Sequence, residues 1–189
     1  LNDGAVAVFA RSTADGTLTY LERKGSDSTA GLDGATAVVV DPSGRHVYVA
    51  GGLDDAVVAF TREAVSGRLN PLQVVADSSD GVVGLNGAAA LALSPSGGAL
   101  YVAGQAADSI VLLRRDPTTG RLTFVERVRD GGGAEGLDGV DGLALSPDGA
   151  HLYSAALASD AVAVFARPGD STCPASGVGD IREPVNVAA

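Results

Sequence analysis

The chain has 189 residues and a net charge of −10 at pH 7, and its 13 basic residues form no cluster. Nucleic acids and anionic membrane surfaces both require concentrated Lys or Arg, so the composition argues against either partner. One cysteine excludes an intrachain disulfide framework, and no apolar run approaches the roughly 20 residues that span a bilayer.

The first predicted element, AVAVFAR at residues 5–11, returns unchanged at residues 161–167. Between the two copies a longer unit repeats, with the sequences GLDGATAVVVDPSGRHVYVAG, GLNGAAALALSPSGGALYVAG and GLDGVDGLALSPDGAHLYSAA. These units begin at Gly31, Gly84 and Gly136, which are 53 and 52 residues apart. The two AVAVFAR copies therefore lie three periods from each other. Repeats of this length indicate a propeller or another repeat architecture.

Each full unit predicts four short strands. The first is an apolar run such as ATAVVVD that ends at a Pro-Gly turn, and strands of the types HVYVA, AVVAF and GRLNPLQ follow it. The first and third runs are apolar at successive positions, so we expect both of their faces to be buried. Four-stranded units of about 50 residues predict an all-β fold, a β-propeller built from blades. A β-sandwich is the alternative, but it would not produce near-equal periods.

The repeats also predict how the chain is divided. Thirteen strands are expected, and the third strand of the unit is present four times, so the ring is incomplete or open. The chain is then either a fragment of a larger propeller or an open unit whose strand edges are met by another copy. The expected parts are a half blade at 1–27, full blades at 31–83 and 84–135, a partial blade at 136–167, and a linker or tail at 168–189 that begins another domain or supplies a completing strand.

The succession SPDG-x-x-LYVA, DAVxVF and TGRLTFVE resembles the bacterial lactonase-type β-propellers with YVTN-like repeats. That family includes 6-phosphogluconolactonase-like proteins and repeat-bearing surface proteins. The resemblance covers residues 1 to about 167, and it implies the fold more specifically than the activity. The tail run CPASGVGDI is similar to part of an Ig-like repeat of bacterial surface proteins, which implies an extracellular or cell-surface location.

Residue types that often carry chemistry recur here at fixed repeat positions, which favours structural roles. His46 and His151 share one position, where the middle unit has Ala99. Aspartates precede the third strand, and we expect them to accept hydrogen bonds from turn amides. Tyrosines of the second strand are expected to pack in the core or between blades. These two sets are Asp55, Asp108 and Asp160, and Tyr48, Tyr101 and Tyr153.

The loops between the units are rich in carboxylates, which are the ligands that calcium prefers. The candidate calcium ligands are Asp130, Glu135, Asp138 and Asp141. No other cofactor is expected. No stretch matches a nucleophile elbow, a phosphate-binding glycine loop or a metal-ligand cluster, so no catalytic residue is predicted. Cys173 in the tail is expected to be an inert or interchain thiol.

Two hypotheses of function follow. The first is a non-catalytic, extracellular β-propeller repeat protein that acts as a structural or interaction module. It would bind other copies of itself, or other surface proteins, through its open strand edges and self-assemble by strand exchange. The alternative is part of a lactonase-type, 6-phosphogluconolactonase-like hydrolase, for which turnover of sugar lactones would be decisive.

Overall fold

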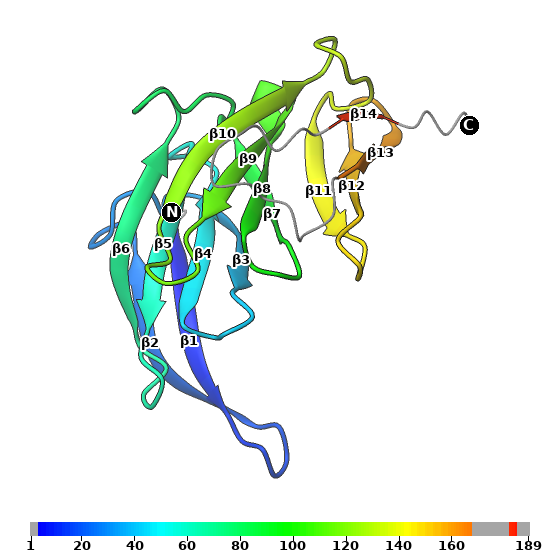
Figure 1. Cartoon of the computed structure of the whole chain (residues 1–189). Helices are drawn as coiled ribbons and strands as arrows, with labels where there is room; N and C mark the ends of the chain where they lie inside the picture. Colours follow the sequence, from blue (N-terminus) through cyan, green and yellow to red (C-terminus); the bar gives the residue numbers. More distant parts are fainter. Residues whose placement is uncertain (1–3, 168–181, 185–189) are drawn as a thin grey trace.

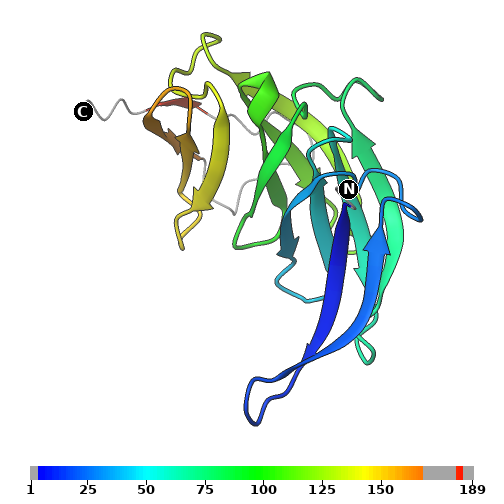
Figure 2. The same cartoon turned by 180° about the vertical axis from the view of Figure 1, so that it is seen from behind.

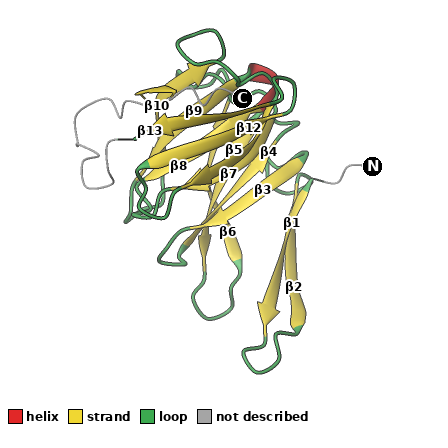
Figure 3. Ribbon diagram, turned by 90° about the vertical axis from the view of Figure 1, so that its right-hand side faces the viewer, coloured by secondary structure: helices red, strands yellow, loops and turns green. Residues whose placement is uncertain are grey.

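The structure is a computed structural model that describes residues 4–167 and 182–184. Their regular secondary structure consists of β-strands and one short 3-10 helix, η1 (Gln105–Ala107) (Figure 1, Figure 3). The strands make four antiparallel sheets. The first sheet pairs β1 (Ala5–Arg11) with β2 (Leu18–Gly25). The second holds β3 (Ala35–Val40), β4 (His46–Gly51), β5 (Ala56–Arg62) and β6 (Leu69–Ala76). The third holds β7 (Ala88–Leu93), β8 (Ala99–Gly104), β9 (Ser109–Arg115) and β10 (Leu122–Arg129). The fourth holds β11 (Val140–Leu145), β12 (His151–Ala156), β13 (Ala161–Ala166) and β14 (Arg182–Pro184).

The four sheets stand side by side in chain order, from β1–β2 at one end of the row to β11–β14 at the other (Figure 1, Figure 2). The first strands of successive four-stranded sheets contact each other, β3 with β7 and β7 with β11, so these strands line the inner edge of the row. Four-stranded sheets that meet at their first strands are the blades of a β-propeller, which confirms the predicted fold class. The described residues form an arc and do not close the ring.

The turn between the first two strands of each blade follows from its sequence. Asp41 accepts a hydrogen bond at Oδ1 from the amide of His46, at 2.7 Å. Ser94 and Ser146 hold the corresponding amides with their hydroxyl oxygens. Gly44 adopts a φ of 69°, a left-handed conformation that favours glycine. The repeated Asp/Ser-Pro-x-Gly pattern therefore closes the turn and starts the second strand.

Apolar side chains from facing sheets form the cores between the blades. One core joins Tyr48 and Val57 of the second sheet to Leu100 and Val111 of the third. The next core joins the opposite face of the third sheet to the fourth sheet, where Phe165 is fully buried. Because side chains alternate along a strand, each middle blade contributes one set of residues to each neighbour.

The outer strands add polar links between neighbouring blades. The side chain of Gln73 on β6 accepts a hydrogen bond from the Leu122 amide of β10 at 2.9 Å and donates one to the Leu122 carbonyl at 3.0 Å. Glu22 on β2 accepts a hydrogen bond from the Leu69 amide of β6 at 2.6 Å. These polar residues occupy one repeat position, and each secures the following blade.

One expectation about strand burial is wrong for β3. Its apolar run predicts that both faces are buried, yet Val38 and Val40 are 54% and 53% exposed. The physical reason lies in the preceding sheet, which contains only β1 and β2, so no inner strand covers this face of β3. In β9, which has a complete blade on each side, Ile110 through Leu113 are buried on both faces.

Residues 4–167 and 182–184 contain fourteen strands, one more than the thirteen predicted for the chain. The additional strand, β14, pairs antiparallel with β13 at the outer edge of the fourth sheet. It spans three residues and ends at Pro184. It lies within the tail at 168–189, for which a completing strand was one of the two expectations.

Candidate functional site

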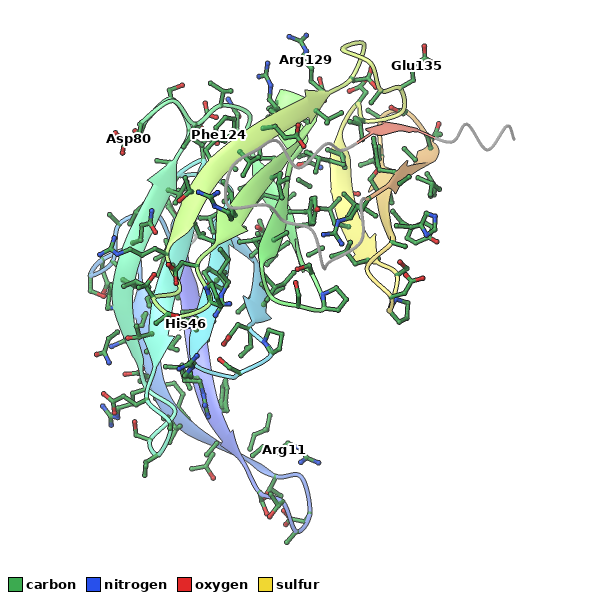
Figure 4. The ribbon with its side chains drawn as sticks, viewed as in Figure 1. Arg11, His46, Asp80, Phe124, Arg129 and Glu135 are labelled. Atoms are coloured by element: carbon green, nitrogen blue, oxygen red, sulfur yellow. The ribbon has the colours of Figure 1, made fainter. Side chains whose placement is uncertain are left out.

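Each blade has two ends with different chemistry, and Figure 4 labels residues at both. We define the turn end as the end that holds the turns between first and second strands, where His46 lies. The loop end is the opposite end, where the segments between sheets run and where Arg129 and Glu135 lie (Figure 4).

The turn end holds a buried polar network between the second and third sheets. Arg115 of β9 donates to the Tyr48 hydroxyl at 2.6 Å, to Asp41 at 2.7 Å and to the carbonyl of Gly97 at 3.0 Å. Its guanidinium also lies 3.0 Å from Nδ1 of His46, which accepts as a neutral imidazole. The side chains of Arg115 and Asp41 are each 2% exposed.

The surroundings fix the charges of this network. Burial lowers the pKa of His46 below its ordinary 6.5, and the positive charge of Arg115 lowers it further. Burial acts in the opposite direction on Asp41. Hydrogen bonds from Ser43 and the His46 amide, with the charge of Arg115, outweigh that effect and hold the Asp41 pKa below 3.8. A charged Asp41–Arg115 pair beside a neutral histidine therefore stabilises the interface, and its burial closes it to a substrate.

The same arrangement recurs between the third and fourth sheets. Arg167 donates to the Tyr101 hydroxyl and to the carbonyl of Gly149, each at 2.5 Å. The Arg115 guanidinium lies 5.8 Å from the Tyr48 ring centre, and Arg167 lies 5.0 Å from that of Tyr101, which are cation–π distances. We call this arginine–tyrosine–carbonyl unit the interblade clasp. It explains the recurrence of tyrosine on the second strand.

At the loop end the recurring aspartates hold the next blade. Asp55 accepts a hydrogen bond from the amide of Gly87 at 2.7 Å, and Asp108 accepts one from the amide of Gly139 at 2.9 Å. Each amide belongs to the following intersheet loop, although a bond within the turn itself was expected. The φ angles of these aspartates, 51° and 49°, place them in the left-handed region. A structural role accounts for these contacts.

One of these aspartates, the half-buried Asp108, also acts on the exposed carboxyl group of Asp138. The negative charge of Asp108 raises the pKa of Asp138. Partial desolvation of the Asp138 carboxyl group and the charge of Asp130 act in the same direction. Asp138 lies in the loop before β11, and the corresponding residue before β7 is Asn86. The blade interface at Asp108 therefore carries two neighbouring carboxyl groups, whereas the interface at Asp55 carries one.

A carboxyl group with a raised pKa retains a basic oxygen that can take a proton from water. Asp138 is exposed and Asp108 is half-buried, in contrast to the buried turn-end network. The Asp108–Asp138 pair is the candidate functional site. Sequence reasoning assigned Asp108 to a turn and Asp138 to calcium, and no local signal joins residues that come from different blades.

The candidate calcium ligands come together only in part. Asp130 and Asp138 lie near each other, and Asp130 accepts a hydrogen bond from the Leu137 amide at 2.9 Å. Glu135 and Asp141 are exposed. Across residues 4–167 and 182–184, no group of three or more His, Cys, Asp or Glu side chains is arranged to hold a metal ion. Calcium binding remains a prediction.

The other predicted features lie apart from this site. His151 is exposed at the turn end of the fourth sheet, whereas His46 is buried. Cys173 and the run CPASGVGDI lie outside the described residues. Within the part of the chain that the structure describes, no helix is long and apolar enough to cross a membrane.

Comparison with known proteins gives three related matches. The family model described as "Lactonase, 7-bladed beta-propeller" matches residues 2–188. The 6-phosphogluconolactonase of Bacillus subtilis (strain 168) is 29% identical over 125 residues, which are 66% of this chain and 35% of that protein. The periplasmic gluconolactonase of Pseudomonas aeruginosa is 27% identical with a TM-score of 0.72, over 97% of this chain and 47% of that one.

A putative 6-phosphogluconolactonase from Bacteroides uniformis shares the fold at 22% identity and a TM-score of 0.70, over 87% of this chain and 48% of that one. This chain thus spans about a third to a half of the length of these relatives. The family match overturns the first functional hypothesis, that of a non-catalytic extracellular module. Blade repeats without a catalytic motif led to that hypothesis, because such repeats report the scaffold rather than the chemistry. Since the match extends over residues 2–188, the chain belongs to the lactonase family of seven-bladed β-propellers.

Proposed function

We propose that the protein containing these blades hydrolyses a sugar lactone of the gluconolactone type. The family match over residues 2–188 is the observation that carries the proposal. Two relatives support the substrate class, because one is a 6-phosphogluconolactonase and the other a gluconolactonase. The chain covers part of each relative, so the proposal concerns the whole protein to which it contributes.

The reaction needs a base near the lactone carbonyl. Water attacks the carbonyl carbon, the ring C–O bond breaks, and the product is a hydroxy acid. A positioned carboxylate that takes the water proton during the attack raises the rate by about 10²–10⁴-fold. We assign this role to Asp138, because the charge of Asp108 raises its pKa and makes its carboxylate a stronger base, and because the residue is exposed.

The direct test is lactone turnover by the protein isolated from its natural source. Glucono-δ-lactone and its 6-phosphate are supplied separately, and acid release is followed against the spontaneous rate. Turnover well above the spontaneous rate with either lactone is the expected result. A preference between the two identifies the substrate. The absence of acceleration with both would overturn the proposed function.

A conservative variant tests the assigned base. Asp138→Asn gives the interface between the third and fourth sheets the same Asp–Asn pairing that Asp55 and Asn86 have between the second and third sheets, so the fold should be retained. We expect kcat to fall by about 10²–10⁴-fold. Asp33→Asn, at the same repeat position of the loop before β3, is the matched control and should keep its activity. Full activity in Asp138→Asn would leave lactone hydrolysis standing and exclude this base.

We also propose that the protein works outside the cytoplasm. The periplasmic gluconolactonase of Pseudomonas aeruginosa, which aligns with 97% of this chain, supports that location. Fractionation of the source cells, followed by mass spectrometry of peptides from residues 31–167, tests it. Recovery of these peptides with cytoplasmic markers would contradict the location and leave the activity untouched.

A further inference from the structure

The loops that lead into β3, β7 and β11 share one repeated sequence, Gly-Leu-Asp-Gly, except that the loop before β7 has asparagine in place of aspartate. Asn86 and Gly87 form the one Asn-Gly sequence of the chain, and the residues equivalent to Asn86 are Asp33 and Asp138. An asparagine followed by glycine loses its side-chain amide most readily, because glycine has no side chain to hinder attack by its own nitrogen. Asn86 is exposed, so water reaches its carboxamide.

The loss of this amide begins at the backbone nitrogen of the glycine. That nitrogen gives up its proton and attacks the side-chain carbonyl carbon of Asn86. The C–N bond of the carboxamide breaks, and its amino group takes up a proton and leaves as ammonia. Water then opens the resulting cyclic imide at either carbonyl, which gives aspartate or isoaspartate. The surroundings of one backbone N–H therefore control the reaction.

The structure places that N–H against a carboxylate of the preceding blade. Gly87 donates it to Oδ1 of Asp55 at 2.7 Å. The hydrogen bond stabilises the protonated nitrogen, and loss of the proton would set a negative nitrogen beside a negative carboxylate. Asp55 therefore opposes the first step of the reaction.

The same peptide is also held by its own blade, through η1. The carbonyl of Asn86 accepts a hydrogen bond from the Ala106 amide at 3.1 Å. The carbonyl of Gly87 accepts one from the Gln105 amide at 3.0 Å. The imide ring includes the Asn86 backbone, and these bonds resist any rotation that would bring the Gly87 nitrogen onto the Asn86 side chain.

We propose that Asn86 is a deamidation site that the Asp55 carboxylate keeps unreactive while the second and third sheets are docked at their loop ends. Opening of this interface frees the Gly87 N–H and starts the reaction, so deamidation at Asn86 records separation of the two blades. The product carries a second carboxyl group beside Asp55, as Asp138 lies beside Asp108 in the next interface. The inference goes beyond lactone hydrolysis and does not depend on it.

Deamidation of the natural, full-length protein at mildly alkaline pH tests the protection. Peptide mass spectrometry follows the exchange of NH2 for OH at Asn86, and a synthetic peptide of residues 80–92 gives the rate without the fold. We expect the folded protein to react at least about tenfold more slowly than the peptide, as one hydrogen bond to a charged group provides. Equal rates would overturn the proposal. Asn70 is the internal reference, because Pro71 has no N–H from which the imide could form.

A matched pair of variants separates the effect of the carboxylate from the general stability of the blades. Asp55→Gly and Asp108→Gly each remove an aspartate that holds the next loop, and glycine accepts the left-handed backbone of both positions. We expect Asp55→Gly to raise the rate at Asn86 nearly to that of the peptide, and Asp108→Gly to leave it unchanged. Equal acceleration by both variants would assign the protection to overall stability, and no acceleration by either would exclude Asp55. Each of these two results overturns the proposal.

Asp55→Asn is a second variant, for the case that Asp55→Gly does not fold. It suits the same left-handed backbone and keeps an acceptor oxygen, but it removes the negative charge. We expect a rate at Asn86 between those of the unmodified protein and the peptide. A rate equal to that of the unmodified protein would overturn the assignment to the carboxylate.

Discussion

The two complete blade interfaces share one clasp but differ in what surrounds it. Between the second and third sheets, Asp41 contacts Arg115 at 2.7 Å and His46 lies against the same guanidinium. Between the third and fourth sheets, the residues at these two repeat positions are Ser94 and Ala99. Arg167 nevertheless keeps its bonds to tyrosine and to a turn carbonyl. The carboxylate and the imidazole are therefore additions to a clasp that forms without them.

The difference separates what builds a blade interface from what modifies it. In both interfaces a guanidinium lies over a tyrosine ring and donates to the tyrosine hydroxyl and to a carbonyl. These contacts fix the position of the positive charge. Adding Asp41 places a second buried charge beside the first. Such a pair is costly to break, because removing one partner leaves the other buried and uncompensated. We expect the Asp41 interface to be the more sensitive of the two to substitution and to pH.

The largest expected effect is that of Asp41→Ala. The variant leaves Arg115 buried without its carboxylate and also removes the acceptor of the His46 amide. We expect the free energy of unfolding to fall by about 3–5 kcal/mol. Ser94→Ala at the equivalent position of the other interface removes only a neutral acceptor, and about 1 kcal/mol is expected. Urea denaturation of both variants measures the difference.

Equal losses in the two variants would contradict the comparison. They would mean that Asp41 contributes only its hydrogen bond in the turn, a role that Ser94 also performs. The charge pair would then add nothing measurable to the stability of the interface.

The comparison also shows which features could be predicted from sequence. The period, the turn chemistry and the four-stranded blade follow from local patterns, since each is written within one unit. The Asp41–Arg115 contact joins residues 74 positions apart, and it depends on which face of one blade meets the next. His46 and His151 are identical in the repeat, yet one is 5% exposed and the other is exposed, because a described blade covers only the first.

The candidate site was less accessible to sequence reasoning than the fold. The aspartate before the third strand recurs, so a bond from a backbone amide to Asp108 was predicted, although within its own turn and not from Gly139 of the following loop. Its neighbour Asp138 comes from the loop that leads into the following blade, 30 residues later. Only the stacking of that loop over the Asp108 turn brings the two carboxyl groups together.

A smaller effect concerns the pH dependence of stability. The pKa of His46 is below 6.5 in the folded chain, so the unfolded chain binds more protons as the pH falls below 6.5, and acidification destabilises the fold. The lowered pKa of Asp41 has the same sign, and its contribution is lost only below pH 3.8. His46→Ala introduces the alanine that the middle blade has at this position.

We expect His46→Ala to reduce the decrease in unfolding free energy between pH 7 and pH 5, whatever its effect at neutral pH. Urea denaturation across that range measures the slope, with the exposed His151→Ala as control. If the His46→Ala slope matched that of the unmodified protein, the buried histidine would not be the group that titrates. If only His151→Ala removed the slope, His151 and not His46 would be the histidine whose titration destabilises the fold.

The smallest predicted effect lies in the other interface and has the opposite sign. Ser154 on β12 is 1% exposed, and its hydroxyl has no hydrogen-bond partner within the described part of the chain. The equivalent residue of β8 is Val102, which is fully buried in the neighbouring core. A buried hydroxyl without a partner costs free energy, so Ser154→Val should raise the free energy of unfolding by about 1 kcal/mol.

Ser154→Thr is the matched control for this substitution, because it adds the same methyl group and keeps the hydroxyl. Stabilisation by valine but not by threonine would assign the effect to the unpaired oxygen. Equal stabilisation by both would assign it to volume, and would show that the interface is underfilled there. Destabilisation by valine would mean that the site has no room for a methyl group. Close packing would then limit the stability of the interface between the third and fourth sheets, whereas the buried charge limits that of the interface between the second and third sheets.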